Sequence, residues 1–434
     1  MAISRLSGGF RKFPNGLGSV RLLFVHANFP AQFRRLAPWL AKSGHDIIFL
    51  AENKEWHAPS TERIRIKRYR LHRSGGGEFL HPYLRRFDTA VLTGQAVYRA
   101  CREISSKGWT PDWVINHVGF GCGFYLRDAF PNARRAALFE WYYNAYGSDV
   151  EFLQKGRVEP DRQMRLRTWN AQSLLELADV DFAVTPTRWQ KRQFPKHLRS
   201  RLRVIHEGID WQEFSRIRFS RPLKPLCLKG KENCEVVTYV SRGFEDYRGF
   251  PQAMQAFAQL QRWRPGLQVL IAGSDIVAYG PERIDGRSWG QWARQEAGLD
   301  PERTHWLGAL QTTEYQELLA WSDAHLYLTV PFVLSWSLLE AMAAGCPIVA
   351  SDTEPVQEVM ANGVHGLLVD FYDVEAQAKA IEILLNDKRL AASLGHEAQK
   401  EASKFSADAG LDAWSQLLSL TQHGKTDPVA SASL

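Results

Sequence analysis

The sequence lacks the features of a membrane-spanning or secreted protein. No apolar run reaches the ~18 residues that a spanning helix needs. The first eighteen residues, MAISRLSGGFRKFPNGLG, are basic and glycine-rich and have no apolar core of a signal peptide. The 434 residues include five cysteines and no C-x-x-C pair, so free thiols in a reducing compartment are expected. These absences together predict a cytoplasmic protein.

Motifs that indicate a metal or a bound cofactor are also missing. The sequence has no H-E-x-x-H zinc motif, no P-loop and no G-x-G-x-x-G dinucleotide fingerprint. The stretch DVD at 179–181 superficially resembles a D-x-D metal site, but it falls between a helix end and an apolar strand. We interpret it as a connector and predict no metal site and no resident cofactor.

Charge is distributed unevenly along the chain. Residues 1–210 hold 34 Lys and Arg against 19 Asp and Glu, whereas residues 211–434 hold 20 against 28. A basic half favours an anionic partner such as a membrane surface or an acidic acceptor. We expect no nucleic acid as partner, because the sequence has no recognition motif. The arginine-rich run at 63–73 fits an anionic partner and fits equally well a solvent-exposed edge strand whose charges prevent pairing with another chain.

Both halves of the chain alternate apolar strands with amphipathic helices. In the first half, a strand, a helix and a strand follow one another within residues 20–51, which is a βαβ unit of a parallel sheet. The same alternation restarts with CEVVTYVSRG at 234–243. The sequence therefore predicts an α/β protein with two doubly wound, Rossmann-like parallel-sheet domains. They should face each other across a cleft at the carboxyl ends of their strands, where such sheets bind ligands.

These patterns predict a division of the chain into five parts. They are a flexible basic tail over 1–18, a first domain over 19–207, a second domain over 208–395, a C-terminal helix over 396–421 and a disordered tail over 422–434. The boundary between the domains is expected near 207–232, a stretch rich in Arg, Lys and Pro.

The stretch VLSWSLLEAMAAGCPIVASD at 333–352 contains an isolated carboxylate, Glu340, within an apolar helix-forming run. Ser337 and Glu340 fit a capping box, in which the glutamate reaches back to the first amide of the helix. A carboxylate at such a strand-end loop also suits two neighbouring hydroxyls, such as those of a ribose, while the nearby amides face an anion. The pattern leaves both readings open.

Three further side chains stand at the ends of expected strands. Arg242 and Arg248 follow the strand at 234–243, where two guanidiniums would clamp a diphosphate and stabilise it as a leaving group. Alone, they also fit two ordinary surface arginines. His117 ends the strand in VINHVGFG, where a structural role is the alternative to a ligand contact.

Together these segments resemble the family 4 (group 1) glycosyltransferases of the GT-B fold. The resemblance runs from about Val20 to Leu420 and rests on LLEAMAAGCPIVASD, NGVHGLLVD, VIHEGID and SRGFEDYRGF. The segments FVHANFPAQFRRLA and FEWYYNAYGSDVEF are similar to one bacterial branch of that family. The resemblance implies retaining, metal-independent transfer of a sugar from a nucleotide-diphosphate sugar. The donor would lie mainly on the second domain and the acceptor on the first.

The resemblance also implies roles for individual residues. The expected catalytic residues, one touching the transferred sugar and two holding the diphosphate, are His117, Arg242 and Arg248. The expected donor-binding residues, at the ribose, beside it and around the base, are Glu340, Ser335, Trp336, Ser337, Trp306, Leu307 and Gly308. The expected acceptor-side residues are Asn28, Gln32 and Glu140.

One position departs from the family pattern. The first glutamate of the family's E-x7-E motif, which contacts sugar hydroxyls, is replaced here by Phe332, eight residues before Glu340. Backbone groups of residues 333–335 replace this glutamate, or the donor differs, or activity is lost.

The expected function is transfer of a sugar to a glycan, lipid-linked or protein acceptor in cell-surface polysaccharide biosynthesis. The basic first domain makes the inner face of the plasma membrane a candidate site of peripheral attachment. The alternative is a non-catalytic nucleotide-sugar-binding protein of the same fold.

Overall fold

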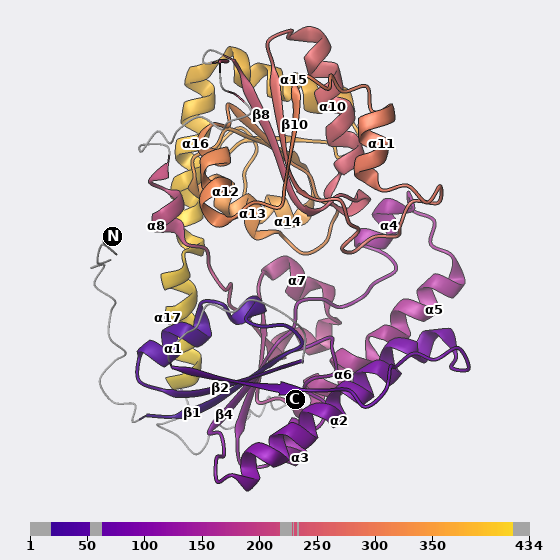
Figure 1. Cartoon of the computed structure of the whole chain (residues 1–434), viewed down its shortest axis with the longest axis vertical. Helices are drawn as coiled ribbons and strands as arrows, with labels where there is room; N and C mark the ends of the chain where they lie inside the picture. Colours follow the sequence, from indigo (N-terminus) through magenta and orange to yellow (C-terminus); the bar gives the residue numbers. More distant parts are fainter. Residues whose placement is uncertain (1–18, 53–62, 218–227, 229, 232–233, 420–434) are drawn as a thin grey trace, which may run out of the picture.

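The chain folds into two α/β domains, one above the other in Figure 1. The computed structural model describes residues 19–52, 63–217, 228, 230–231 and 234–419. The tails predicted at 1–18 and 422–434 lie outside the described residues, as does most of the stretch in which the domain boundary was expected.

The first domain is built on a parallel sheet of seven strands in the order β3-β2-β1-β4-β5-β6-β7. The strands are β1 Arg21–His26, β2 Asp46–Glu52, β3 Ile64–Tyr69, β4 Trp113–His117, β5 Arg134–Leu138, β6 Phe182–Thr185 and β7 Leu202–Val204. The order reverses direction between β1 and β4, which is the doubly wound topology that the sequence predicts. The arginine-rich run forms β3 at the edge of the sheet, as the charge-guarded reading predicts.

Helices cover both faces of this sheet. They are α1 Leu36–Lys42, α2 Arg85–Ser106, α3 Leu126–Ala129, α4 Asp149–Leu153, α5 Pro160–Trp169, α6 Ala171–Asp179 and α7 Arg188–Gln193. The single helix expected between the two strands within 20–51 is divided into a 3-10 turn, Ala31–Phe33, and α1. One face packs against α1, and the other packs against α2 and α3.

The second domain contains a parallel sheet of six strands in the order β10-β9-β8-β11-β12-β13. The strands are β8 Val236–Gly243, β9 Gln268–Ser274, β10 Thr304–Gly308, β11 Ala324–Tyr327, β12 Ile348–Ser351 and β13 Leu367–Val369. Its helices are α8 Trp211–Phe214, α10 Phe250–Trp263, α11 Trp289–Glu296, α12 Thr312–Ala320, α13 Trp336–Ala343, α14 Glu354–Gln357, α15 Val374–Asn386 and α16 Lys388–Ala402. Two apolar clusters on the two faces of the sheet form its core.

The prediction of one continuous C-terminal helix over 396–421 is wrong. The helix α16 ends at Ala402, and α17 Ala407–Ser419 begins after a 3-10 turn, Ser403–Phe405. The break coincides with a long-range contact, because the backbone of residues 405–407 hydrogen-bonds to Ile209, with Ile209 N–Phe405 O at 2.9 Å and Ala407 N–Ile209 O at 2.7 Å. This pairing places the two crossings between the domains side by side.

The helix α17 belongs to the first domain rather than to the second. Its apolar residues Leu411, Trp414, Leu417 and Leu418 are buried in the same cluster as β1, β2 and α1. The chain therefore crosses from the first domain to the second near Ile209 and returns near Ser406 (Figure 1). Within the described ranges, no helix combines the length and apolar character needed to cross a membrane.

Candidate functional site

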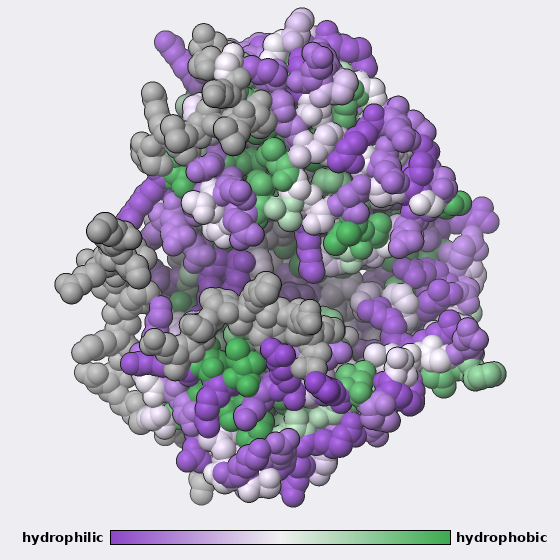
Figure 2. Space-filling model, in the orientation of Figure 1, coloured by the Kyte–Doolittle hydropathy of each residue, from purple (hydrophilic) through white to green (hydrophobic). Residues whose placement is uncertain are grey.

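The ends of strands from both sheets enclose a cavity of about 980 Å³ between the domains. Segments that follow β1, β4, β5 and β6 line it from the first domain, and the ends of β8 and β11 line it from the second. The surface view shows a hollow at this level between the domains (Figure 2). The cavity lies where the sequence predicts a ligand site, and its volume is in the range of small-molecule sites.

The structure brings most of the predicted site residues to this cavity. The predicted residues that line it are Asn28, Gln32, His117, Glu140, Arg242, Arg248, Ser335, Trp336 and Ser337. Four predicted residues, Glu340 and the segment 306–308, do not line it. The roles assigned to these residues stay predictions.

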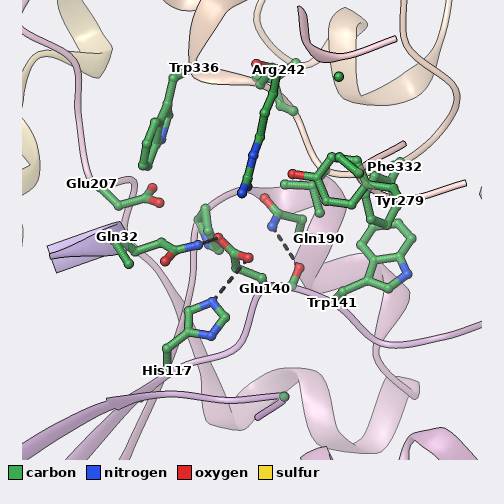
Figure 3. Close-up of a pocket in the computed structure, with 18 of the residues that line it drawn as sticks. Gln32, His117, Glu140, Trp141, Gln190, Glu207, Arg242, Tyr279, Phe332 and Trp336 are labelled. Carbon is green, nitrogen blue, oxygen red and sulfur yellow. Dashed lines mark hydrogen bonds and ion pairs between the residues drawn. The ribbon is translucent and has the colours of Figure 1, made fainter. Parts of the chain in front are cut away.

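A buried polar cluster forms the first-domain side of the cavity. We call it the polar wall, and it consists of His26, Gln32, His117 and Glu140, of which the last three are labelled in Figure 3. His117 Nε2 lies 3.2 Å from Glu140 Oε2, and Gln32 Nε2 donates a 2.9 Å hydrogen bond to Glu140 Oε1. The rings of His26 and His117 are 4.9 Å apart.

Burial and charge set the protonation of the polar wall. Burial opposes ionisation of Glu140, but His117 and Gln32 outweigh this effect and hold the pKa of the carboxyl below its ordinary value. Burial, with the nearby His117, lowers the pKa of His26 to about 3, so His26 is neutral at physiological pH. The wall therefore presents an ionised glutamate beside two imidazoles to any ligand in the cavity.

Glu207 is a site residue that the sequence analysis does not select. It lines the cavity from the segment that joins the domains, and no described residue donates a hydrogen bond to its buried Oε2 atom. Burial and the charge of Glu140 raise the pKa of Glu207 to about 7. The only signal in the sequence is that this glutamate in VIHEGID stands where the family usually has Asn.

The two arginines of the second domain differ in how they are held. Arg248 is buried, and its Nη1 donates hydrogen bonds of 2.7 Å to Thr329 Oγ1 and 3.1 Å to the carbonyl of Val333. Arg242 is exposed to the cavity and projects between its two sides (Figure 3). The structure thus places one guanidinium fixed in the wall and one reaching into the open space, which suits an anionic ligand.

The capping-box reading of Glu340 is wrong. Ser335 is the residue that caps α13, and its Oγ accepts a 3.3 Å hydrogen bond from the backbone N–H of Ser337. Glu340 instead lies one turn along the helix, where its Oε1 is 3.6 Å from Arg34 Nη2 of the first domain. Burial raises the pKa of Glu340, and the charge of Arg34 acts in the opposite direction. Arg34 also lies 4.1 Å over the ring of Trp336, so a first-domain side chain covers the start of α13.

Aromatic rings from both domains meet on the opposite side of the cavity from Glu207. We call this the aromatic wall, and it consists of Trp141, Tyr279 and Phe332 (Figure 3). Phe332 lies at its centre, with ring centroids 4.7 Å from Trp141 and 5.3 Å from Tyr279. Phe332 stands where the resemblance expects a glutamate. Its neighbours are aromatic rings rather than polar groups.

The segment Trp306 to Gly308 lies beyond the cavity lining, at the end of β10 on the edge of the second sheet. Trp306 packs against Phe244 and Phe250, with ring centroids 6.0 and 6.3 Å apart. The guanidinium of Arg294 stacks 4.2 Å from the Trp306 ring. Because this segment does not line the cavity, its contact with a nucleotide base stays a prediction.

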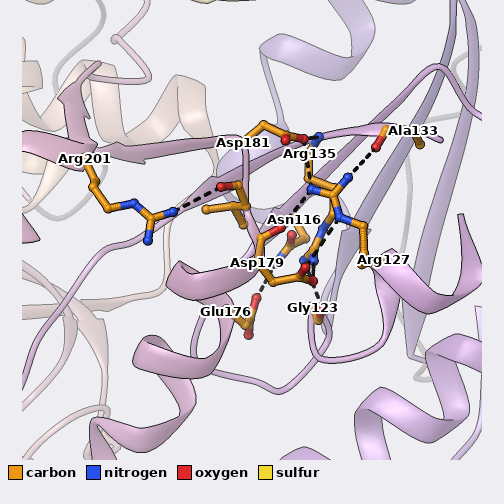
Figure 4. A network of polar contacts seen from close by, with 10 residues as sticks. Asn116, Gly123, Arg127, Ala133, Arg135, Glu176, Asp179, Asp181 and Arg201 are labelled. Carbon is orange, nitrogen blue, oxygen red and sulfur yellow. Dashed lines mark hydrogen bonds and ion pairs between the residues drawn. The ribbon is translucent and has the colours of Figure 1, made fainter. Parts of the chain in front are cut away.

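The DVD stretch serves the fold of the first domain. Asp179 pairs with the fully buried Arg135, and Asp181 lies 3.1 Å from Arg127 (Figure 4). The first pair ties the end of α6 to the start of β5, and the second ties the residue before β6 to α3, as the connector reading predicts. In the part of the chain that the structure describes, no group of three or more His, Cys, Asp or Glu is arranged to hold a metal ion.

Several hydrogen bonds join the two domains. Trp189 Nε1 donates a 3.1 Å hydrogen bond to the carbonyl of Phe332, and the Tyr247 hydroxyl donates one of 2.6 Å to Asp149. The carboxylate of Glu358 accepts from the first two amides of α7, at 2.7 and 2.5 Å. One cavity between the domains thus has walls of different chemistry.

Comparison with known protein families assigns both domains. Residues 43–214 match the model described as Glycosyl transferase family 4 group, and residues 228–401 match the model described as Glycosyl transferases group 1. Together the two matches include nearly all of the two parallel sheets.

Individual relatives and structures agree with these families. The exopolysaccharide phosphotransferase SCO2592 of Streptomyces coelicolor is 41% identical over 93 residues, which is 21% of this chain and 10% of that protein. The chain spans between 10 and 25% of the length of this and two other bacterial relatives. The glycogen synthase of Mycobacterium tuberculosis is 27% identical over 94% of this chain and 97% of its own length. The structure of Anabaena Alr3699/HepE in complex with UDP-glucose superposes with a TM-score of 0.66 and 17% identity, covering 92% of this chain and 100% of that one. This likeness establishes the GT-B fold.

Proposed function

Since the chain belongs to the family 4, group 1 glycosyltransferases, we propose that it transfers a sugar from a nucleotide-diphosphate sugar, with retention of anomeric configuration and without a bound metal. The observation that carries this proposal is the single cavity between the domains. It joins Arg242, Arg248 and the start of α13 on one side to His117 and Glu140 on the other.

The second-domain side of the cavity suits the nucleoside diphosphate. Arg242 reaches into the space, Arg248 is fixed beside it, and the first amides of α13 lie at the same place. Cationic side chains and helix N-termini both favour a diphosphate. Glu340, one turn along α13, is the carboxylate that would accept hydrogen bonds from the ribose hydroxyls once Arg34 moves aside. Anabaena Alr3699/HepE, a protein of the same fold, forms complexes with UDP and with UDP-glucose, which supports a nucleotide-sugar donor here.

The first-domain side suits the transferred sugar and the acceptor. His117 and Glu140 form a fixed pair that meets sugar hydroxyls, while Asn28 and Gln32 extend the same side toward the acceptor. In a front-face reaction, the acceptor hydroxyl attacks the anomeric carbon on the side from which the diphosphate leaves. The departing phosphate oxygen takes the hydroxyl proton, so no protein nucleophile is needed. The two arginines stabilise the negative charge that develops on the diphosphate.

The acceptor class is a glycan, a lipid-linked sugar or a protein in cell-surface polysaccharide biosynthesis. The names of similar proteins support this choice, because they include an exopolysaccharide phosphotransferase and a lipopolysaccharide core biosynthesis glycosyltransferase. The excess of Lys and Arg in residues 1–210 favours a cytoplasmic enzyme that works against the anionic inner face of the plasma membrane.

A thermal-shift panel of nucleoside diphosphates and nucleotide sugars tests the donor site. A ligand that binds only the folded protein raises its melting temperature in proportion to its occupancy. We expect one base family to raise the melting temperature of the wild type, and Glu340→Ala to lose most of this shift. The matched control is Arg34→Ala, which breaks the Arg34–Glu340 pair but keeps the carboxylate, and it should keep the shift. No shift with any donor would contradict the proposal.

The replacement of a family glutamate by Phe332 favours a second candidate, a non-catalytic nucleotide-sugar-binding protein. It predicts the same thermal shifts without any reaction. Release of nucleoside diphosphate from the bound donor, measured with and without candidate acceptors, separates the two. Transfer or donor hydrolysis at any rate above the Glu340→Ala background would exclude the second candidate.

A further inference from the structure

The proposed reaction assigns no role to the aromatic wall. Trp141 follows β5 of the first domain, Tyr279 lies in the loop after β9, and Phe332 precedes α13. Three separate segments from two domains thus converge on one side of the cavity. A fourth ring, that of Tyr247, supports Phe332 from behind at 5.2 Å. Phe332 is therefore held on several sides and presents a fixed apolar surface.

The polar atoms of the wall residues and of the segment that carries Phe332 are mostly hydrogen-bonded elsewhere or buried. The Phe332 carbonyl accepts from Trp189 Nε1, and the Val333 carbonyl accepts from Arg248. The Tyr247 hydroxyl donates to Asp149. Trp141 Nε1 is buried, and no described residue accepts its hydrogen. Apart from the hydroxyl of Tyr279, the wall offers carbon to a ligand rather than hydrogen-bonding groups.

The position of the wall defines which part of a donor would touch it. Arg242 and Arg248 lie next to the wall, and the guanidinium of Arg248 is 5.5 Å from the Tyr279 ring. A diphosphate held by these arginines puts the attached sugar between the aromatic wall and the polar wall of His117 and Glu140 (Figure 3). The sugar then has hydrogen-bonding partners on one side and aromatic rings on the other.

A sugar hydroxyl pressed against the aromatic wall loses its hydrogen bonds to water and gains none, which is unfavourable. A methyl group in the same place packs against the rings and is taken out of water. We propose that the cavity selects a 6-deoxyhexose as the transferred sugar, with its methyl group against Phe332, Trp141 and Tyr279. This inference rests on the proposed function, because it assumes that a nucleotide sugar is the ligand.

Matched donors that differ by one oxygen atom test the inference on the wild-type protein. Suitable pairs are GDP-mannose with GDP-rhamnose, UDP-glucose with UDP-6-deoxyglucose, and dTDP-glucose with dTDP-6-deoxyglucose. Affinities are measured by calorimetry for the base that binds, together with the free nucleoside diphosphate. We expect the deoxy member to bind about 10- to 100-fold more tightly, since one such group in an apolar pocket discriminates by this amount. Equal affinities, or tighter binding of the hydroxylated member, would overturn the inference.

Two substitutions at Phe332 sharpen the test. Phe332→Glu introduces a hydrogen-bonding carboxylate and should reverse the preference toward the hydroxylated donor, whereas Phe332→Leu keeps an apolar surface and should retain most of it. Melting temperatures near that of the wild type show that both variants are folded, and the affinity of each variant for the free nucleoside diphosphate is the reference for its sugar preference. Retention of the deoxy preference in Phe332→Glu would overturn the assignment of the methyl group to this wall.

The free nucleoside diphosphate separates the two possible failures. If it binds and the donor pairs show no preference, the proposed function stands and the deoxy-sugar inference is wrong. If neither the diphosphate nor any donor binds, both are wrong. If the wall binds an aromatic acceptor instead, Phe332→Glu lowers acceptor affinity and leaves donor preference unchanged, which likewise overturns the inference.

Discussion

The polar wall and the aromatic wall face the same cavity but are assembled in different ways. The polar wall consists of residues at or just beyond the ends of neighbouring strands of one sheet, so the fold of the first domain alone brings His26, His117 and Glu140 together. The aromatic wall needs both domains, because Trp141 meets Phe332 only when they are closed on each other. One wall is thus formed within a single domain, whereas the other exists only where the two domains meet. Four substitutions around the cavity sharpen this comparison, and the largest effect is expected at Arg242, beside the aromatic wall.

Arg242→Ala should have the largest effect, because it removes the exposed guanidinium that reaches into the cavity. Loss of a group that stabilises developing charge typically lowers turnover by about 100- to 1000-fold, and we expect kcat/KM to fall by this factor. Calorimetry with the nucleoside diphosphate should show weaker binding as well. Arg262→Ala, at an exposed arginine of α10 outside the cavity, is the control and should change neither value. Unchanged diphosphate affinity in Arg242→Ala would exclude the clamp.

Glu207→Gln should alter the pH dependence of stability. The carboxyl has a pKa of about 7 in the folded protein against an ordinary value of 4.5. Between these two pH values, the folded state keeps a proton that the unfolded chain has already released. This contribution to stability is present below pH 4.5 and is lost as the pH rises to about 7. The glutamine cannot ionise, so the variant does not lose this stability as the pH rises. Its free energy of unfolding at pH 8.5 should therefore improve by at most about 3 kcal/mol relative to the wild type, since each pKa unit corresponds to about 1.4 kcal/mol.

Melting curves at pH 5 and pH 8.5 measure this difference. The other buried carboxyls are common to both proteins, so the change in the gap between wild type and variant reports Glu207. A gap that is the same at both pH values would mean that Glu207 is ionised in the folded protein throughout.

His117→Asn should slow transfer without weakening diphosphate binding, because His117 belongs to the polar wall and not to the diphosphate site. It removes the imidazole that lies 3.2 Å from Glu140. Leaving the buried Glu140 carboxylate without this partner costs about 1–3 kcal/mol, so we expect transfer to slow by about 10- to 100-fold while affinity for the free nucleoside diphosphate stays the same. The control is His197→Asn at an exposed histidine. A loss of diphosphate affinity equal to the loss of transfer would contradict the separation of the two walls.

Ser335→Ala should have the smallest effect. It removes the hydroxyl that accepts the Ser337 amide at the start of α13, and loss of such a cap costs about 1 kcal/mol of stability. Denaturant unfolding without nucleotide measures this cost. Ser335→Asn supplies another capping side chain and should restore most of the loss. If Asn fails to restore it, the hydroxyl serves another purpose than capping.

The fold was largely predictable from the sequence because each strand and helix carries its own pattern. Apolar runs such as 20–27 and 267–274 predict β1 and β9 to within a residue or two, and strand–helix–strand alternation implies a parallel sheet. The resemblance to family 4 glycosyltransferases is confirmed by the family matches over both domains. The continuous C-terminal helix was wrong, and the break at 403–406 coincides with pairing to Ile209, almost 200 residues earlier.

The site was predictable where a residue sits at the end of a strand and not where loops meet. His117 and Arg242 end β4 and β8, so the expectation of strand ends around one cleft places them in the cavity. Trp141, Tyr279 and Phe332 are far apart in the sequence, and only the closed domains show that they touch. The capping box failed for a smaller reason: Ser335 and Ser337 are both suitable caps, and the sequence does not say which one begins the helix.

The placement of α17 has a consequence for how this protein is made. The first sheet begins with β1 at Arg21, but the helix that completes the cover on one of its faces ends at Ser419. A ribosome must therefore synthesise almost the whole chain before the first domain can bury Trp414 and its neighbours. During that interval, an apolar surface on a nearly finished sheet is open to chaperones and to aggregation. Although the first domain emerges first, it is completed last.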